Sequence, residues 1–397
     1  MKDLFSNKKK KSILLIYNEL PIPTFGGNIR VYYLLKELSK QLNVTLLVIP
    51  ARREQRYDKS KLNGICKVIF APCFIEDVID RNFVNYFLRV SYYKCQSLFQ
   101  SKAKLILQHN YQIFCLRKEL LKLLKKRNFD YIQVEHSFFG KVLDGINTQS
   151  IKILDFQNVY SFMENNSDEM IKIRRYESGL SKKYDIALCC SEIDKKRLAS
   201  LGYKNVLIVP NGVNISEYRY TEKINNPTSL LFIGTFLYGP NIKGIKYFLN
   251  QILPLLPKDL KINLIGSYRN RDFQDFLKNK NVIFHGFVDD INPFLKNAIF
   301  ICPLLDGGGT RLKILTAFAA GSPVVSTTKG AEGIECTNNK DILIADSPKF
   351  FAKRIKDLLS NQDLFIKLKH NAFELVKKKY SWDITCKNYI KYLKSLK

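Results

Sequence analysis

The residues best suited to chemistry lie in one short stretch in the last third of the chain. Three consecutive glycines, Gly307, Gly308 and Gly309, follow an apolar run and precede a segment with helical spacing that begins at Arg311. Glycines before a helix let backbone N–H groups approach a ligand closely, and the helix N-terminus adds partial positive charge. Arg311 and Lys313 add two full charges. This spacing predicts a site for a phosphate or diphosphate group.

The flanking segments predict how this stretch is positioned. Residues 299–305 form an apolar run of strand length, and residues 324–326 form another. Between them the helical pattern stops at Gly321, which fits the position just past a helix C-terminus. Strand, glycine loop, helix and strand in this order are typical of a Rossmann-like unit, which binds its ligand at the carboxyl ends of its strands.

A similar order occurs near the N-terminus, where a strand over 12–17 is followed by Gly26–Gly27, a helix and a strand over 44–49. It predicts a second Rossmann-like domain. A further predicted strand, 131–136, ends in Glu135 and His136. An acidic side chain at the end of such a strand could bind a hydroxyl group or accept a proton.

Composition limits the classes of protein and of partner. A chain of 397 residues is long enough for two domains, and its net charge of +28 favours anionic partners such as a membrane surface or phosphorylated substrates. A lysine-rich genome is the alternative explanation. The nine cysteines show no Cys-x-x-Cys pair, which argues against a zinc site and favours a reducing compartment. Residues 81–127 are basic and aromatic with helical spacing, which predicts either a membrane-facing surface or an ordinary packed helix pair.

The stretch from Asp306 to Ser326 closely resembles the donor-binding signature of family 4 glycosyltransferases, retaining enzymes of the GT-B fold, in the group 1 branch with the signature G-G-G-T-R-L-K-I-L. Residues 210–213 and 286–290 resemble further segments of that family. The resemblance implies an α/β GT-B fold, with two Rossmann-like domains whose parallel sheets face a central cleft. The acceptor-binding domain would span residues 1–205 with the crossover helix 381–397, and the nucleotide-sugar donor-binding domain would span 206–380.

This resemblance implies retaining, hexosyltransferase-type transfer from a nucleotide diphosphate sugar to an acceptor hydroxyl. The context would be synthesis of bacterial surface polysaccharide or lipopolysaccharide. The expected partners are a nucleotide-sugar donor, a glycan or lipid-linked acceptor and an anionic membrane surface, whereas nucleic acid is not expected. The expected location is cytoplasmic, with peripheral attachment to the inner face of the cell membrane. No cofactor and no metal is expected, because no Asp-x-Asp follows a strand and GT-B enzymes generally need none.

The resemblance also assigns roles to individual residues. Arg311 and Lys313 would neutralise the departing diphosphate and Glu135 would act at the transferred sugar, so these three are the expected catalytic residues. The expected donor-binding residues are Gly26, Gly27, His136, Gly234, Thr235, Gly266, Phe287, Asp306, Gly307, Gly308, Gly309, Thr310, Thr316 and Glu332.

One position departs from the family pattern. Thr316 stands where the family has a glutamate that binds the ribose hydroxyls, and threonine cannot make the bidentate contact of a carboxylate. Either Asp306 or Glu332 takes that role, or donor binding is weakened or altered. The alternative function is therefore a non-catalytic GT-B partner or scaffold that has lost donor binding. A nucleic-acid module, for which no recognition motif is present, and a GT-B sugar epimerase are further alternatives.

Overall fold

The structure is a computed structural model that divides into two compact units. It describes residues 10–23, 26–49, 60–71, 103–163, 167–221, 227 and 229–396. The first unit comprises Met1–Val209 and Cys386–Lys397, and the second comprises Pro210–Thr385. The helices expected within residues 81–102 lie outside the described residues.

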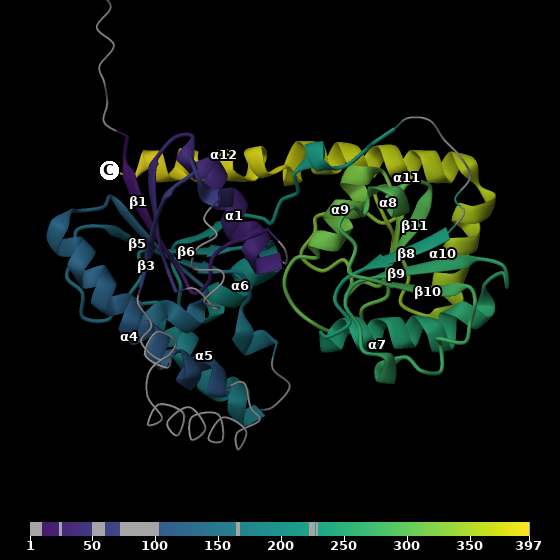
Figure 1. Cartoon of the computed structure of the whole chain (residues 1–397), viewed down its shortest axis with the longest axis horizontal. Coiled ribbons are helices and arrows are strands. Elements are labelled where there is room, and N and C mark those ends of the chain that lie inside the picture. The colour runs from purple at the N-terminus through teal and green to yellow at the C-terminus, as the bar shows by residue number, and fades with distance from the viewer. Residues whose placement is uncertain are drawn as a thin grey trace, which may run out of the picture. The chain divides into compact units, whose positions relative to one another are not determined.

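Within the described residues, the first unit holds a parallel sheet of seven strands in the order β3-β2-β1-β4-β5-β6-β7. The interior strand β1 buries Ile13, Leu14, Leu15 and Ile16 completely, because helices cover both faces of the sheet (Figure 1). The strands are β1 (Ser12–Tyr17), β2 (Asn43–Val48), β3 (Lys67–Phe70), β4 (Tyr131–Glu135), β5 (Ile151–Phe156), β6 (Ile186–Cys189) and β7 (Val206–Ile208).

The helices of this unit include α1 (Gly26–Ser39), α4 (Ala103–Lys126), α5 (Ser167–Leu180) and α6 (Glu192–Ser200), together with α12 (Trp382–Ser395) from Cys386 onward. β7 pairs with β6 in the first sheet. Residues 206–209 therefore lie in the first unit, although the sequence placed them at the start of the second domain. The helix expected over 381–397 is α12, and its first residues, 382–385, lie in the second unit.

The second unit has a parallel sheet of six strands, as far as the structure describes it, in the order β10-β9-β8-β11-β12-β13. Helices again lie on both faces (Figure 1). Its strands are β8 (Ser229–Ile233), β9 (Lys261–Ile265), β10 (Val282–Gly286), β11 (Ala298–Cys302), β12 (Val324–Ser326) and β13 (Leu343–Ile344). Its helices include α7 (Gly239–Tyr247), α8 (Asn292–Leu295), α9 (Leu312–Ala320), α10 (Pro348–Ser360) and α11 (Gln362–Leu375).

Helix α9 has the boundaries that its sequence pattern predicts. Ile314, Leu315 and Phe318 face the core with no exposed surface. Gly321 follows the helix with φ of 72°, a left-handed conformation that glycine adopts at low cost, and the Ser322 N–H donates to the Ala317 carbonyl at 2.8 Å. The buried face and the glycine stop therefore fix the orientation and the C-terminal end of α9, which follows β11 and the glycine loop.

Each sheet has one point where the strand order reverses direction. In the first unit this point lies between β1 and β4, and in the second it lies between β8 and β11. Loops that leave the carboxyl ends of two such strands diverge to opposite faces of the sheet, which opens a crevice where ligands bind in this class of fold. The topology therefore predicts ligand sites at the carboxyl ends of β1 and β4 in the first unit and of β8 and β11 in the second.

Candidate functional site

The glycine loop Asp306–Thr310 follows β11 at the reversal point of the second sheet. Gly307 and Gly309 have φ of 96° and 75°, which favour glycine. A Cβ atom added at Gly307 would lie 3.2 Å from the Pro240 side chain and 3.3 Å from Nη2 of Arg311. The loop therefore packs closely against the first turn of α7 and against the arginine that precedes α9.

Arg311 is held by the glycine loop and still has unused hydrogen-bonding capacity. Its guanidinium donates to the carbonyl of Gly308 and, over 3.3 Å, to the carbonyl of Asp306. Its Nε is buried without a partner, as are Oδ1 of Asp306 and Oγ1 of Thr310. Buried polar atoms are normally hydrogen-bonded. Three unpartnered polar atoms within six residues indicate that this loop has the capacity to hydrogen-bond a ligand.

Lys313, in the first turn of α9, lies beside the end of β8. Its Nζ donates to Oδ1 of Asn241 at 2.8 Å and lies 4.0 Å from the centre of the Phe232 ring. No carboxylate among the described side chains forms an ion pair with it. Burial lowers the pKa of Lys313 to about 8. A bound anion would favour the charged ammonium group, so this lysine is poised to receive negative charge.

Glycines that follow β8 and β9 leave space for the side chain of Lys313. A Cβ atom at Gly234 would lie 2.6 Å from the lysine Nζ and 2.9 Å from Nδ2 of Asn241. Asn241 in turn donates from Nδ2 to the Thr235 carbonyl at 2.8 Å. A Cβ at Gly266 would lie 2.2 Å from the Gly234 carbonyl oxygen, so the ends of β8 and β9 touch. The structure thus brings Gly234, Thr235 and Gly266 together with Lys313.

Other predicted residues of the second unit have different surroundings. Phe287, after β10, is 73% exposed. Asp306 forms an ion pair with Lys243 at 2.8 Å, and Glu332 forms one with Lys329 at 2.6 Å. The Thr316 hydroxyl lies 3.3 Å from the Tyr218 hydroxyl. Thr316 is therefore paired with a hydroxyl group, while both acids proposed to substitute for a family glutamate are engaged with lysines.

In the first unit, Gly27 lies at the reversal point between β1 and β4. A Cβ atom added to it would lie 2.9 Å from Oε1 of Gln157, 3.5 Å from the Tyr17 hydroxyl and 3.8 Å from Nε2 of His136. The Tyr17 hydroxyl donates to Oδ1 of Asn28 at 2.6 Å. Gly27, which the sequence placed in a loop, lies in the first turn of α1 and closely approaches polar groups from the ends of β1, β4 and β5.

Glu135 is completely buried, unlike the half-buried His136 that follows it. Its two carboxylate oxygens accept hydrogen bonds from Nε2 of Gln133 at 2.6 Å and Nε2 of Gln157 at 3.1 Å. Burial, and then the Asp155 carboxylate, raise the pKa of Glu135. Glu135 is therefore buried at the end of β4, where it accepts a hydrogen bond from Gln157. Of the two residues, His136 is the one whose side chain lies near Gly27.

A buried ion pair anchors the start of α1 to β5. Arg30 and Asp155 are both essentially unexposed, and Nε and Nη2 of Arg30 donate to the two carboxylate oxygens at 2.9 and 3.1 Å. Nη1 of Arg30 donates to the Val209 carbonyl at 2.8 Å. This bidentate geometry fixes α1, whose first two residues are Gly26 and Gly27.

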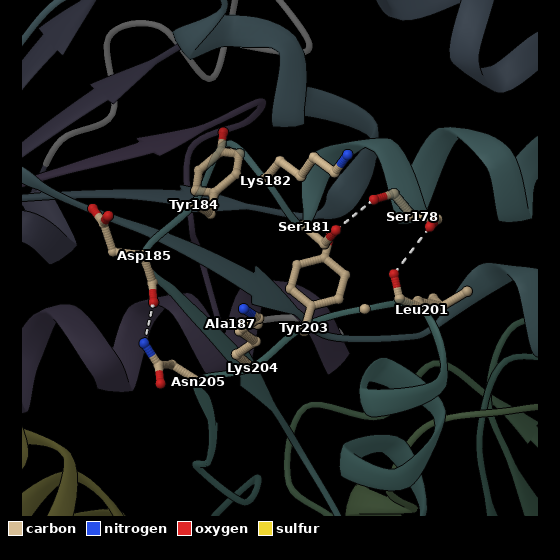
Figure 2. A pocket seen from close by; sticks show the side chains of 11 residues that line it. Ser178, Ser181, Lys182, Tyr184, Asp185, Ala187, Leu201, Tyr203, Lys204 and Asn205 are labelled. Atoms are coloured by element: carbon tan, nitrogen blue, oxygen red, sulfur yellow. Dashed lines mark hydrogen bonds between the residues drawn. The ribbon is translucent and has the colours of Figure 1, made fainter.

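Two cavities of the first unit lie at the opposite edge, where β5, β6 and β7 begin. One, of about 660 Å³, lies beside Lys152 and Asp144, and the other, of about 530 Å³, lies between the end of α5 and Tyr203 (Figure 2). The phenols of Tyr184 and Tyr203 donate to carbonyl groups of the protein at 2.8 Å. Neither cavity contains a predicted site residue, and their aromatic hydroxyls are already engaged.

The described part of the chain offers neither a metal site nor a membrane-spanning helix. No group of three or more His, Cys, Asp or Glu residues there could hold a metal ion. None of the described helices combines the length and the apolar character needed to cross a bilayer.

Part of the second unit is similar to a family of glycosyltransferases. Residues 227–361 match the family described as "Glycosyl transferases group 1". The chain is 23% identical over 393 residues to an uncharacterised 44.6 kDa protein in the cps region of Klebsiella pneumoniae, covering 93% of this chain and 96% of that protein. It is 25% identical over 305 residues to an uncharacterised glycosyltransferase of Methanocaldococcus jannaschii, covering 69% and 77% of the two chains.

Solved structures match the fold over nearly the whole chain. Sucrose-phosphate synthase from Thermosynechococcus elongatus aligns with a TM-score of 0.74 at 15% identity, covering 97% of this chain and 99% of that one. The Anabaena protein HepE in complex with UDP and glucose aligns with a TM-score of 0.70 at 13% identity, covering 97% and 100%. The chain has the GT-B fold, with two Rossmann-like α/β domains, and the family match supports a group 1 glycosyltransferase.

Proposed function

We propose that the protein is a retaining glycosyltransferase that moves a sugar from a nucleotide diphosphate sugar to an acceptor hydroxyl. The observation that carries this proposal is the unsatisfied, positively charged glycine loop of the second unit. Three buried polar atoms without partners, and a lysine that pairs with no described carboxylate, lie at the reversal point of the sheet, where this class of fold binds its ligands. The family match over 227–361 includes this loop and supports the assignment.

In the proposed reaction the acceptor oxygen forms a new bond to the anomeric carbon on the face that the diphosphate leaves. The bond from that carbon to the β-phosphate oxygen breaks, and its electron pair stays on the departing nucleoside diphosphate. The acceptor's proton leaves with this anion. Arg311, Lys313 and the N-terminus of α9 stabilise the negative charge that develops on the diphosphate, which is the main task in such a transfer.

The remaining predicted residues take supporting roles in this proposal. Backbone groups of Gly234, Thr235 and Gly266 border the diphosphate, while Phe287 and Glu332 border the nucleotide. The hydroxyl pair of Thr316 and Tyr218, 3.3 Å apart, offers neutral hydrogen bonds to the ribose in place of a carboxylate. Binding should be weaker than with a charge-assisted contact but not abolished.

In the first unit, the edge near Gly26, Gly27 and His136 holds the transferred sugar in this proposal. Glu135 supports that edge through its hydrogen bond to Gln157. A direct contact of Glu135 with substrate would require its buried carboxyl group to exchange partners.

Transfer to a surface polysaccharide or lipopolysaccharide precursor is the proposed context, supported by the Klebsiella relative from a cps region.

Helix α4 supports a peripheral position on an anionic membrane. Phe114 and Leu121 are 63% and 44% exposed, and the exposed Lys118, Lys122 and Lys125 follow the same helical stripe. Sedimentation with phosphatidylglycerol vesicles tests this position. The variant Leu121→Ser should bind less, and equal binding of both proteins would contradict it.

A comparison of two alanine variants tests the donor site. Arg311→Ala should reduce nucleotide-sugar turnover by at least about a hundredfold, since it removes a charged group aimed at the leaving diphosphate. Thr316→Ala should cost less than about tenfold, since it removes one neutral hydrogen bond. Equal losses would refute the phosphate assignment. Near-ultraviolet circular dichroism of both variants verifies that each is folded.

A further inference from the structure

Glu177 is a completely buried acid in the middle of the first unit, far along the chain from every predicted site residue. It lies on α5, and its carboxylate accepts three hydrogen bonds from two loops. The Ser137 hydroxyl donates at 2.9 Å, and the backbone N–H groups of Tyr160 and Ser161 each donate at 3.1 Å. Ser137 follows β4 and the other two follow β5, so one carboxylate joins the loops that leave two adjacent strands.

The residue before Glu177 strengthens the same connection. The Tyr176 hydroxyl lies 3.0 Å from each of the carbonyl oxygens of Ser137 and Phe138. α5 therefore holds both the side chain and the backbone of the turn after β4. Hydrogen bonds to a buried carboxylate are among the stronger ones in proteins, and loss of the charge would leave several donors without an acceptor.

The turn that is held in this way contains His136. Its φ and ψ are 65° and 134°, a region that non-glycine residues rarely occupy. Such a conformation persists only where the surrounding contacts enforce it, and these outliers concentrate at functional sites. The imidazole lies beside Tyr17, with ring centres 5.8 Å apart, and near Gly27. The connection to α5 begins at the very next residue, Ser137.

We propose that Glu177 is a positioning residue that holds the strained His136 turn, and thereby the imidazole, at the carboxyl edge of the first sheet. This inference rests on the proposed function only where it concerns catalysis. The geometric part concerns the position of one histidine and can be tested without a substrate.

The chain contains only four histidines, which makes a direct test practical. Protein labelled with 15N-histidine gives four sets of imidazole signals, and His136→Gln identifies the set that belongs to His136. Glu177→Gln keeps the shape of the side chain but places an amide against the donating N–H groups. It should shift the His136 signals and leave those of His285 and His370, which lie in the second unit, unchanged. Glu192→Gln, at the exposed start of α6, should shift none of the four.

Unchanged His136 signals in folded Glu177→Gln protein would overturn the inference, and so would equal shifts of all four histidines. If that variant does not fold, Ser137→Ala removes only one of the three hydrogen bonds. It should still shift His136 alone, and unchanged His136 signals in it would equally overturn the inference.

Kinetics then test the consequence for the proposed reaction. Glu177→Gln should lower kcat by at least about tenfold and change the donor KM by less than about twofold, since small displacements at a reacting centre mainly affect the transition state. Wild-type kcat in this variant would overturn the catalytic part of the inference. A wild-type protein that transfers no sugar would instead contradict the proposed function, and the histidine signals would still decide the positioning role.

Discussion

The state of Lys313 leads to a specific prediction for the pH dependence of donor binding. Burial lowers the pKa of this lysine to about 8 in the ligand-free site. A diphosphate that contacts the ammonium group raises this pKa again, so binding takes up a proton and weakens as the pH rises through about 8. If only the ammonium form binds, the dissociation constant should rise about tenfold between about pH 7 and about pH 9.

Isothermal titration calorimetry with UDP and GDP measures this effect, because the terminal phosphate of both nucleotides, with a second pKa of about 6, is mostly ionised from about pH 7 upward. Near pH 8, titrations in buffers of different ionisation enthalpy should show uptake of about half a proton for each nucleotide bound. Lys313→Met should weaken binding near pH 7 by roughly 1.5–3 kcal/mol, the range for a hydrogen bond to a charged group, and should remove the pH dependence. Equal affinity at both pH values, or the same slope in Lys313→Met, would refute the reasoning.

Two further predictions concern the supports of the two sites. Gly234→Ala should weaken nucleotide binding at least about tenfold, because its Cβ would lie 2.6 Å from the Lys313 ammonium, whereas Gly239→Ala, with nothing within 4 Å, should bind normally in the same titration. Asp155→Asn should lower the free energy of unfolding by about 3–5 kcal/mol in urea titrations, since it leaves Arg30 buried without its charge partner. Asp144→Asn, which breaks an exposed ion pair, should cost at most about 1 kcal/mol; similar losses in the two variants would contradict this account.

The fold could be predicted from the sequence because its signals are local and repeated. Apolar runs at 12–17 and 299–305 indicated buried parallel strands, and Gly321 indicated where α9 ends. The boundary near residue 206 was less clear, because a three-residue strand carries too few side chains to indicate which sheet it joins. Its pairing with β6 depends on contacts that no short segment of sequence contains.

The candidate site was predicted unevenly, for a similar reason. The glycine loop and its cations are consecutive in the sequence, so their chemistry could be inferred directly. Asn241, which holds Lys313, was missed, although a polar residue in the first helical turn after a strand was an available signal. The choice between Glu135 and His136 depended on one backbone angle, the positive φ of His136, which strand alternation does not predict. The role of Glu177 depends on long-range contacts alone.

In the proposed function, the glycine loop of the second unit binds a nucleoside diphosphate. The most direct test is a calorimetric titration of UDP, GDP and their sugar derivatives into the full chain, with Arg311→Ala and Thr316→Glu as parallel samples. The wild type should bind the diphosphate of one base with a dissociation constant on the order of micromolar, and Arg311→Ala should weaken this binding at least about tenfold. No binding by the folded wild type, with binding gained in Thr316→Glu, would contradict the proposed function and identify a non-catalytic GT-B partner.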